Sequence, residues 1–191
     1  MKKKVTAMVF VSVLAAPFVV VGSSFAAGGH QQRGVRTAAD TASTKLELEA
    51  EMRFRATDIK AAAEVEWEQG TRNGVLRTKL DGEVEILLVN PATAPVAASI
   101  DAGITLTGGL CTFLNDPVVM GPFVVGAQTF YRVVFRGSVA QSGVNPIVSR
   151  GLDCLGIIPA VAIGDSATIN VTGLPAGTTT PILTGTFALD D

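Results

Sequence analysis

Histidine, cysteine and the larger aromatic residues are scarce in this chain of 191 residues, which has one histidine, two cysteines, one tryptophan and one tyrosine. The single histidine, His30, lies near the N-terminus in a stretch with scarcely a large apolar side chain. A Ser-His-Asp or Cys-His mechanism, or a zinc site built on several histidines, therefore has no place in the remainder of the chain. We predict no catalytic residues and no cofactor, and we expect a protein that is not an enzyme.

Positive charge is also in short supply. Of the 15 basic residues, three are the lysines at positions 2 to 4, and only Arg132, Arg136 and Arg150 follow Asn90. Nucleic-acid binding needs clustered Lys and Arg side chains to meet the phosphate backbone. We therefore expect no nucleic-acid partner.

The N-terminal segment has the pattern of a secretory signal. Three lysines precede an apolar run from Val5 to Val21, and the small residues Ser24 and Ala26 stand where signal cleavage requires them. We expect residues 1–26 to be a signal peptide, and its contact with the membrane to end at cleavage. The alternative is an uncleaved anchor, which the shortness of the run and Pro17 disfavour. Export would place the mature protein in the periplasm, at the cell surface or outside the cell.

Residues 27–44 are small and polar, so they bury too little surface to offset the entropy of ordering them. We predict a flexible leader there. Cleavage one residue later would leave Gly28, Gly29 and His30 as a free terminus, whose amine, two amides and imidazole suit square-planar copper or nickel. Because Phe25 disfavours that cut, we expect no resident metal.

Apolar and polar residues alternate from Lys45 onward, which is the pattern of β-strands with one buried and one solvated face. The segments with this alternation are 45–55, 59–68, 100–106, 131–136 and 167–172. Asn73-Gly74 predicts a hairpin turn, and Asp81-Gly82 predicts a break between strands over 75–80 and 83–89. The carboxylates at alternate positions predict a solvated sheet face with charge pairs across strands.

No segment after the leader has a convincing helical period. Many short strands separated by Gly, Pro, Asn and Thr turns predict a single all-β domain over residues 45–191. The expected architecture is an antiparallel β-sandwich, with a barrel as the alternative. Trp67 is in phase with the apolar positions of its strand, so we place it in the core.

Two cysteines, Cys111 and Cys154, remain in an exported chain, and we predict that they form a disulfide. Closing so long a loop is worth on the order of 4 kcal/mol on the chain-entropy model. A redox pair or a metal site would need a Cys-x-x-Cys or Cys/His spacing that the sequence lacks. The cysteines lie in two less regular stretches, 110–125 and 141–162, which we expect to be long connections or broken strands pinned by the disulfide.

Two phenylalanines in the less regular part of the chain, Phe113 and Phe123, are candidates for contact with a partner, although a core position is the alternative for each. The stretch Val118–Val125 has no charge to guard a sheet edge. We therefore expect a structural or protein-interaction role, with an envelope or extracellular protein as partner, including a second copy of the chain itself. The alternatives are a carrier of a small apolar ligand and a hydrolase that uses carboxylates only.

Overall fold

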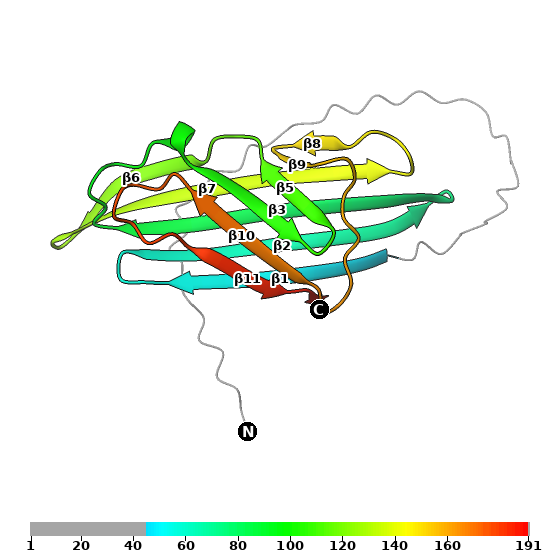
Figure 1. The fold of residues 1–191 in the computed structure, drawn as a ribbon, viewed down its shortest axis with the longest axis horizontal. Helices are drawn as coiled ribbons and strands as arrows, with labels where there is room; N and C mark the ends of the chain where they lie inside the picture. Colours follow the sequence, from blue (N-terminus) through cyan, green and yellow to red (C-terminus); the bar gives the residue numbers. More distant parts are fainter. Residues whose placement is uncertain (1–44, 191) are drawn as a thin grey trace, which may run out of the picture. The chain divides into compact units, whose positions relative to one another are not determined.

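The structure is a computed structural model that describes residues 45–190. The expected signal peptide (1–26), the expected leader (27–44) and the copper alternative at Gly28, Gly29 and His30 lie outside the described residues. Within the described part, two antiparallel sheets and one short 3-10 helix, η1 (Ala97–Ser99), account for the regular structure (Figure 1). None of the helical segments in this part is long and apolar enough to cross a membrane.

The large sheet has seven strands. In spatial order they are β12 (Ala188–Leu189), β1 (Lys45–Arg55), β2 (Ile59–Arg72), β3 (Val75–Val89), β7 (Gln128–Ser142) and β6 (Val118–Val125), with β8 (Val148–Arg150) also paired to β7. The turn between β2 and β3 is Asn73-Gly74, where both residues have positive φ, 53° and 75°. The predicted hairpin is thus confirmed, because both residue types tolerate that conformation.

The small sheet has five strands, in the order β11 (Ile182–Thr186), β10 (Ser166–Thr172), β4 (Asp101–Leu106), β5 (Gly109–Phe113) and β9 (Leu152–Cys154). It packs across one face of the large sheet, as Figure 1 shows, and the inward residues of both sheets form one apolar core. Trp67 is buried in it, and its indole Nε1 donates a hydrogen bond of 3.0 Å to the Pro159 carbonyl. The prediction of an all-β domain is confirmed. The barrel alternative is wrong, because the strands remain in two separate sheets.

The chain passes from one sheet to the other four times, and two of these crossings are sharp corners of a single residue. Gly151 separates β8 of the large sheet from β9 of the small one, and Phe187 separates β11 from β12. Gly137 permits the first corner, because a Cβ atom there would lie only 2.5 Å from the carbonyl oxygen of Gly151. Phe187 is buried in the core, and this burial holds the second corner in place.

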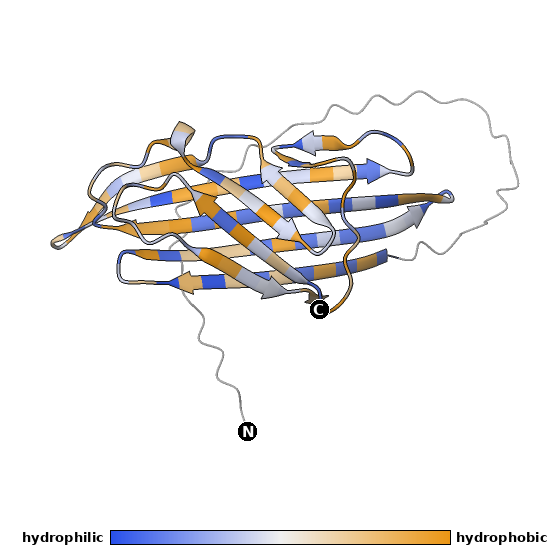
Figure 2. Cartoon of the chain, viewed as in Figure 1, coloured by the Kyte–Doolittle hydropathy of each residue, from blue (hydrophilic) through white to orange (hydrophobic). Residues whose placement is uncertain are grey.

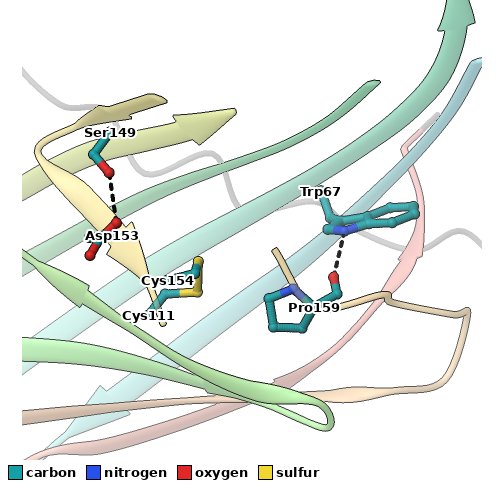
Figure 3. Close-up of a disulfide and its surroundings, with 6 residues drawn as sticks. All are labelled: Trp67, Cys111, Ser149, Asp153, Cys154 and Pro159. Carbon is teal, nitrogen blue, oxygen red and sulfur yellow. Dashed lines mark hydrogen bonds between the residues drawn. A yellow bond between two sulfur atoms is a disulfide. The ribbon is translucent and has the colours of Figure 1, made fainter. Parts of the chain in front are cut away.

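The disulfide between Cys111 and Cys154 is present, as predicted. The two residues lie directly opposite each other in β5 and β9, with Cα atoms 4.0 Å apart and a sequence separation of 43 residues (Figure 3). Both are buried. The irregular stretches that carry them contain the short strands β5, β8 and β9 and the longer β6, which a bulge interrupts. This agrees with the expectation of broken strands pinned by a disulfide.

The prediction of a strand break at Asp81-Gly82 is wrong. β3 continues without interruption from Val75 to Val89, and Gly82 faces the interior. A Cβ atom on Gly82 would lie 2.7 Å from Cδ1 of Ile104 and 3.1 Å from Cζ of Phe113, both in the small sheet. This glycine therefore lets the two sheets approach each other rather than turning the chain.

Candidate functional site

The outer face of the large sheet contains two regions of different chemistry. We call them the acidic rows, formed by carboxylates on β1, β2 and β3, and the apolar edge, formed by β6. Both result from the alternation of the strands, since every second residue that is not in the core points away from it. Hydrophilic residues alternate along β1 and β2, whereas β6 is largely hydrophobic (Figure 2).

The acidic rows place like charges directly opposite one another on neighbouring strands. Strand register aligns Glu49 with Glu66 and Glu66 with Asp81, and it aligns a second row in the same way. The second row comprises Glu51, Glu64 and Glu83. Like charges in directly opposed positions destabilise a sheet.

Burial and repulsion both affect the protonation of carboxyl groups in the two rows. Burial, a hydrogen bond with Glu66 and the charges of Glu49, Glu66 and Glu83 raise the pKa of Glu64 to about 6. Burial, followed by the charges of Glu51, Asp190 and Glu66, also raises the pKa of Glu49. These carboxyl groups therefore take up protons more readily in the folded domain than in the unfolded chain.

Cations at the border of the rows offset part of the repulsion. Arg136 contacts Glu83 at 2.7 Å, Arg132 contacts Glu85 at 2.6 Å, and Lys79 contacts Asp81 at 2.6 Å. An open groove of about 430 Å³ lies over this region. Within residues 45–190 no group of three or more His, Cys, Asp or Glu side chains is placed to hold a metal ion. The acidic rows thus form a solvated face with charge pairs across strands, as the sequence predicts.

The apolar edge is the strand at one end of the large sheet, opposite the end formed by β12, and it has no charged residue. Among the described residues, β6 pairs with β7 and with no strand on its other side. Its large side chains are well exposed: 60% of Val118, 49% of Phe123 and 68% of both Val124 and Val125. Exposed apolar surface of this kind marks interaction sites more often than chance.

A bulge in β6 changes which of its residues face outward. Met120 lies opposite Arg132 and Phe123 opposite Phe130, so β6 advances three residues while β7 advances two. The extra residue falls at Gly121-Pro122, where the peptide bond is cis and Gly121 has a φ of 123°. Because of this extra residue, the side chains of Val118, Met120, Phe123 and Val125 all lie on the outer face of the sheet.

The β6–β7 hairpin extends past the end of β3. The last pair between β3 and β7 is Val89 with Phe130, and Asn90 closes this end by two hydrogen bonds of 2.7 Å with the backbone of Thr129. Beyond it only β6 and β7 pair, up to the turn at residues 126–127. Figure 1 shows this hairpin tip reaching past the neighbouring strands. The apolar edge thus ends in a projecting, uncharged tip.

The other sheet edges are shorter, covered or charged. β12 has two residues and β9 has three, and both continue directly into corners between the sheets. β11 packs against β1, since a Cβ atom on Gly185 would lie 2.7 Å from the carbonyl oxygen of Glu51. β12 pairs only with Leu48 and Glu49 of β1, so within residues 45–190 most of that charged, eleven-residue strand is also unpaired on its outer side. β6 is therefore the long open edge without charge in the part of the chain that the structure describes.

The two predicted contact residues lie in different environments. Phe123 is on the apolar edge, whereas Phe113 lies between the sheets with 9% of its surface exposed and its ring 5.4 Å from that of Phe135. Phe113 therefore offers a partner little surface. Sequence reasoning missed Met120 as an outward residue, although the Gly-Pro pair after it is a signal for a break in strand alternation.

We compared the chain with known proteins. The chain matches no protein-family model, no curated protein and no solved structure.

Proposed function

We propose that this protein is an exported, non-catalytic interaction module and that the apolar edge is its binding surface. The observation that carries the proposal is the exposure of an uncharged, eight-residue edge strand whose large side chains point into solvent. The partner chemistry that fits it is a protein strand of apolar, uncharged sequence, supplied by an envelope or extracellular protein.

Strand addition explains why an edge serves this purpose. The outer N–H and C=O groups of an edge strand can pair with an incoming strand, and alternate side chains then supply specificity. Charges, prolines and bulges normally block such edges. β6 has no charge, and its one proline and its bulge both fall at Gly121-Pro122, so the three residues on each side of that pair keep a regular register with β7. The disulfide supports export, because such bonds persist mainly in oxidising compartments. Together with two corners between the sheets, it provides a rigid base for the edge.

The two other functions expected from the sequence have less support. A carrier of an apolar ligand needs a hollow interior, whereas the space beside Gly82 is filled by Ile104 and Phe113. A carboxylate-only hydrolase needs its acids in a cleft that binds the substrate and holds the scissile bond between them. The acidic rows instead lie on an open face with Lys79 and Arg136 among them.

Site-specific photocrosslinking tests the proposal. A benzophenone amino acid would replace Val124 in the full chain, expressed in a cell that exports it, and the matched control would carry it at Val144, a fully exposed residue of the β7–β8 turn. We expect one discrete adduct from position 124, lost when Phe123→Asp is added, and none from position 144. Equal adducts from both positions, or none from position 124, would overturn the proposal.

A further inference from the structure

The sequence of β6 is nearly symmetric about its centre. The strand is Val-Val-Met-Gly-Pro-Phe-Val-Val, and positions equidistant from the Gly121–Pro122 bond are matched in character. Val118 corresponds to Val125, and Val119 corresponds to Val124. The third pair is Met120 and Phe123, both large and apolar. Such symmetry is what two copies of one strand need in order to pair antiparallel around a two-fold axis.

The bulge makes this symmetry usable in a sheet. Val118 and Val125 are an odd number of residues apart, so in a regular strand they would point to opposite faces. Paired residues in a continuous sheet must share a face. The extra residue at Gly121-Pro122 shifts the alternation, which places Val118 and Val125 on the outer face and Val119 and Val124 on the other. Each matched pair can thus meet on one face.

Charge also permits a second copy to approach. β6 carries no charge, and β7 separates it from the acidic rows. The outward cations Arg132 and Arg136 lie on β7, between the apolar edge and the carboxylates of each copy. Two copies joined at β6 therefore hold their acidic rows apart, on opposite ends of the combined sheet.

From these observations we infer that the partner of the apolar edge is a second copy of this chain, paired antiparallel with β6 about a two-fold axis at the Gly121–Pro122 peptide. The inference rests on the proposed function and names its partner. The large sheet then runs through both protomers. An eight-residue edge contributes a small interface, so the association is weak, with a dissociation constant in roughly the micromolar range.

Sedimentation of the purified full chain at about 1 µM to 1 mM tests the association. We expect a reversible shift from monomer to dimer, and a dissociation constant raised about tenfold or more by Phe123→Asp and by Val124→Asp. Val144→Asp is the matched control and leaves it unchanged, since Val144 lies in the β7–β8 turn. A monomer at every concentration would overturn the inference, and so would sedimentation of monomers with phosphatidylglycerol vesicles that Val124→Asp abolishes.

Cysteine pairing tests the register. Protein carrying Val118→Cys, mixed with protein carrying Val125→Cys, is expected to form an intermolecular disulfide that neither forms alone, and Val119→Cys with Val124→Cys should behave alike. Disulfides between two identical positions would overturn the two-fold antiparallel arrangement. The proposed function fails separately: a photocrosslinked adduct from position 124 whose mass is not twice that of the chain retains the interaction role but contradicts self-pairing.

Discussion

The acidic rows and the apolar edge occupy the same face of the same sheet, yet one is crowded with like charges and the other has none. Their strands obey the same alternation, so the core side of each is built alike. The strands differ in the residues that they expose to water. Charge on β1, β2 and β3 keeps the centre of the sheet solvated at some cost in stability, whereas β6 leaves the edge open to another strand.

The largest expected effect is on stability, and it tests whether the acidic rows and the apolar edge both depend on the disulfide-linked fold. Replacing both cysteines, Cys111→Ala with Cys154→Ala, is expected to lower the free energy of unfolding by about 2–5 kcal/mol, because the disulfide links strands distant in sequence. Urea unfolding monitored by Trp67 fluorescence measures this. The control is the reduced, unsubstituted protein, which should lose a similar amount. An unchanged midpoint would show that the core alone holds the sheets together.

The second prediction concerns the acidic rows alone. Glu64→Gln is expected to raise the free energy of unfolding at pH 7 by about 0.2–1 kcal/mol, because it removes one of three carboxylates in a row. Glu68→Gln is the matched control on the same strand, where Glu47 is opposite on one side but Lys79 is opposite on the other and Lys45 lies 3.5 Å away. It should leave stability unchanged or lower it. Thermal unfolding of both variants gives the comparison, and a stabilising Glu68→Gln would contradict the electrostatic explanation.

The third prediction is a pH dependence. The pKa of Glu64 is about 6 in the folded domain against an ordinary value of 4.5, so the folded state holds its proton more tightly. The stability that this group contributes is complete below about pH 4.5 and is lost as the pH rises through about 6. The free energy of unfolding should therefore rise as the pH falls from 7 to 5.

Urea titrations at several pH values measure this slope, and Glu64→Gln should flatten it. Asp58 acts in the opposite sense, since hydrogen bonds from Thr179 lower its pKa, and its contribution is lost only at more acidic pH. A slope that is equally steep in Glu64→Gln would assign the pH dependence to other carboxylates.

The smallest expected effect concerns the border between the two regions. Arg136→Gln removes the pair with Glu83, whose partners are both largely exposed, and should change the free energy of unfolding by no more than about 0.5 kcal/mol. Differential scanning calorimetry at low and high salt measures it, with added salt reducing the effect further. A larger loss would mean that Arg136 is needed to neutralise the acidic rows.

Local pattern was enough to predict much of this fold. Alternation from Lys45 to Arg55 and from Ile59 onward predicted β1 and β2, the Asn73-Gly74 pair predicted their neighbouring turn, and the two cysteines predicted the disulfide. Each of these signals is contained in adjacent residues or in a count of one residue type. Strand order and the position of β6 at an edge depend on pairings between distant segments, which no local pattern specifies.

Gly82 also shows that local pattern does not reveal contacts between distant segments. Asp81-Gly82 has the composition of a turn, yet Gly82 lies inside β3 because Ile104 and Phe113 of the other sheet occupy the space that its side chain would need. Phe113 illustrates a related limit, since its irregular surroundings in sequence leave both a partner contact and a core position open, and only the packing of the two sheets encloses it.

By itself, the sequence determined the all-β class, the disulfide and the absence of charge along residues 118–125, because these depend on residue type and spacing. Only the tertiary structure decided that this stretch is an exposed edge with a bulge at its centre, since edge and register arise from the competition of all strands for neighbours. That placement turns an uncharged segment into a surface able to accept another strand.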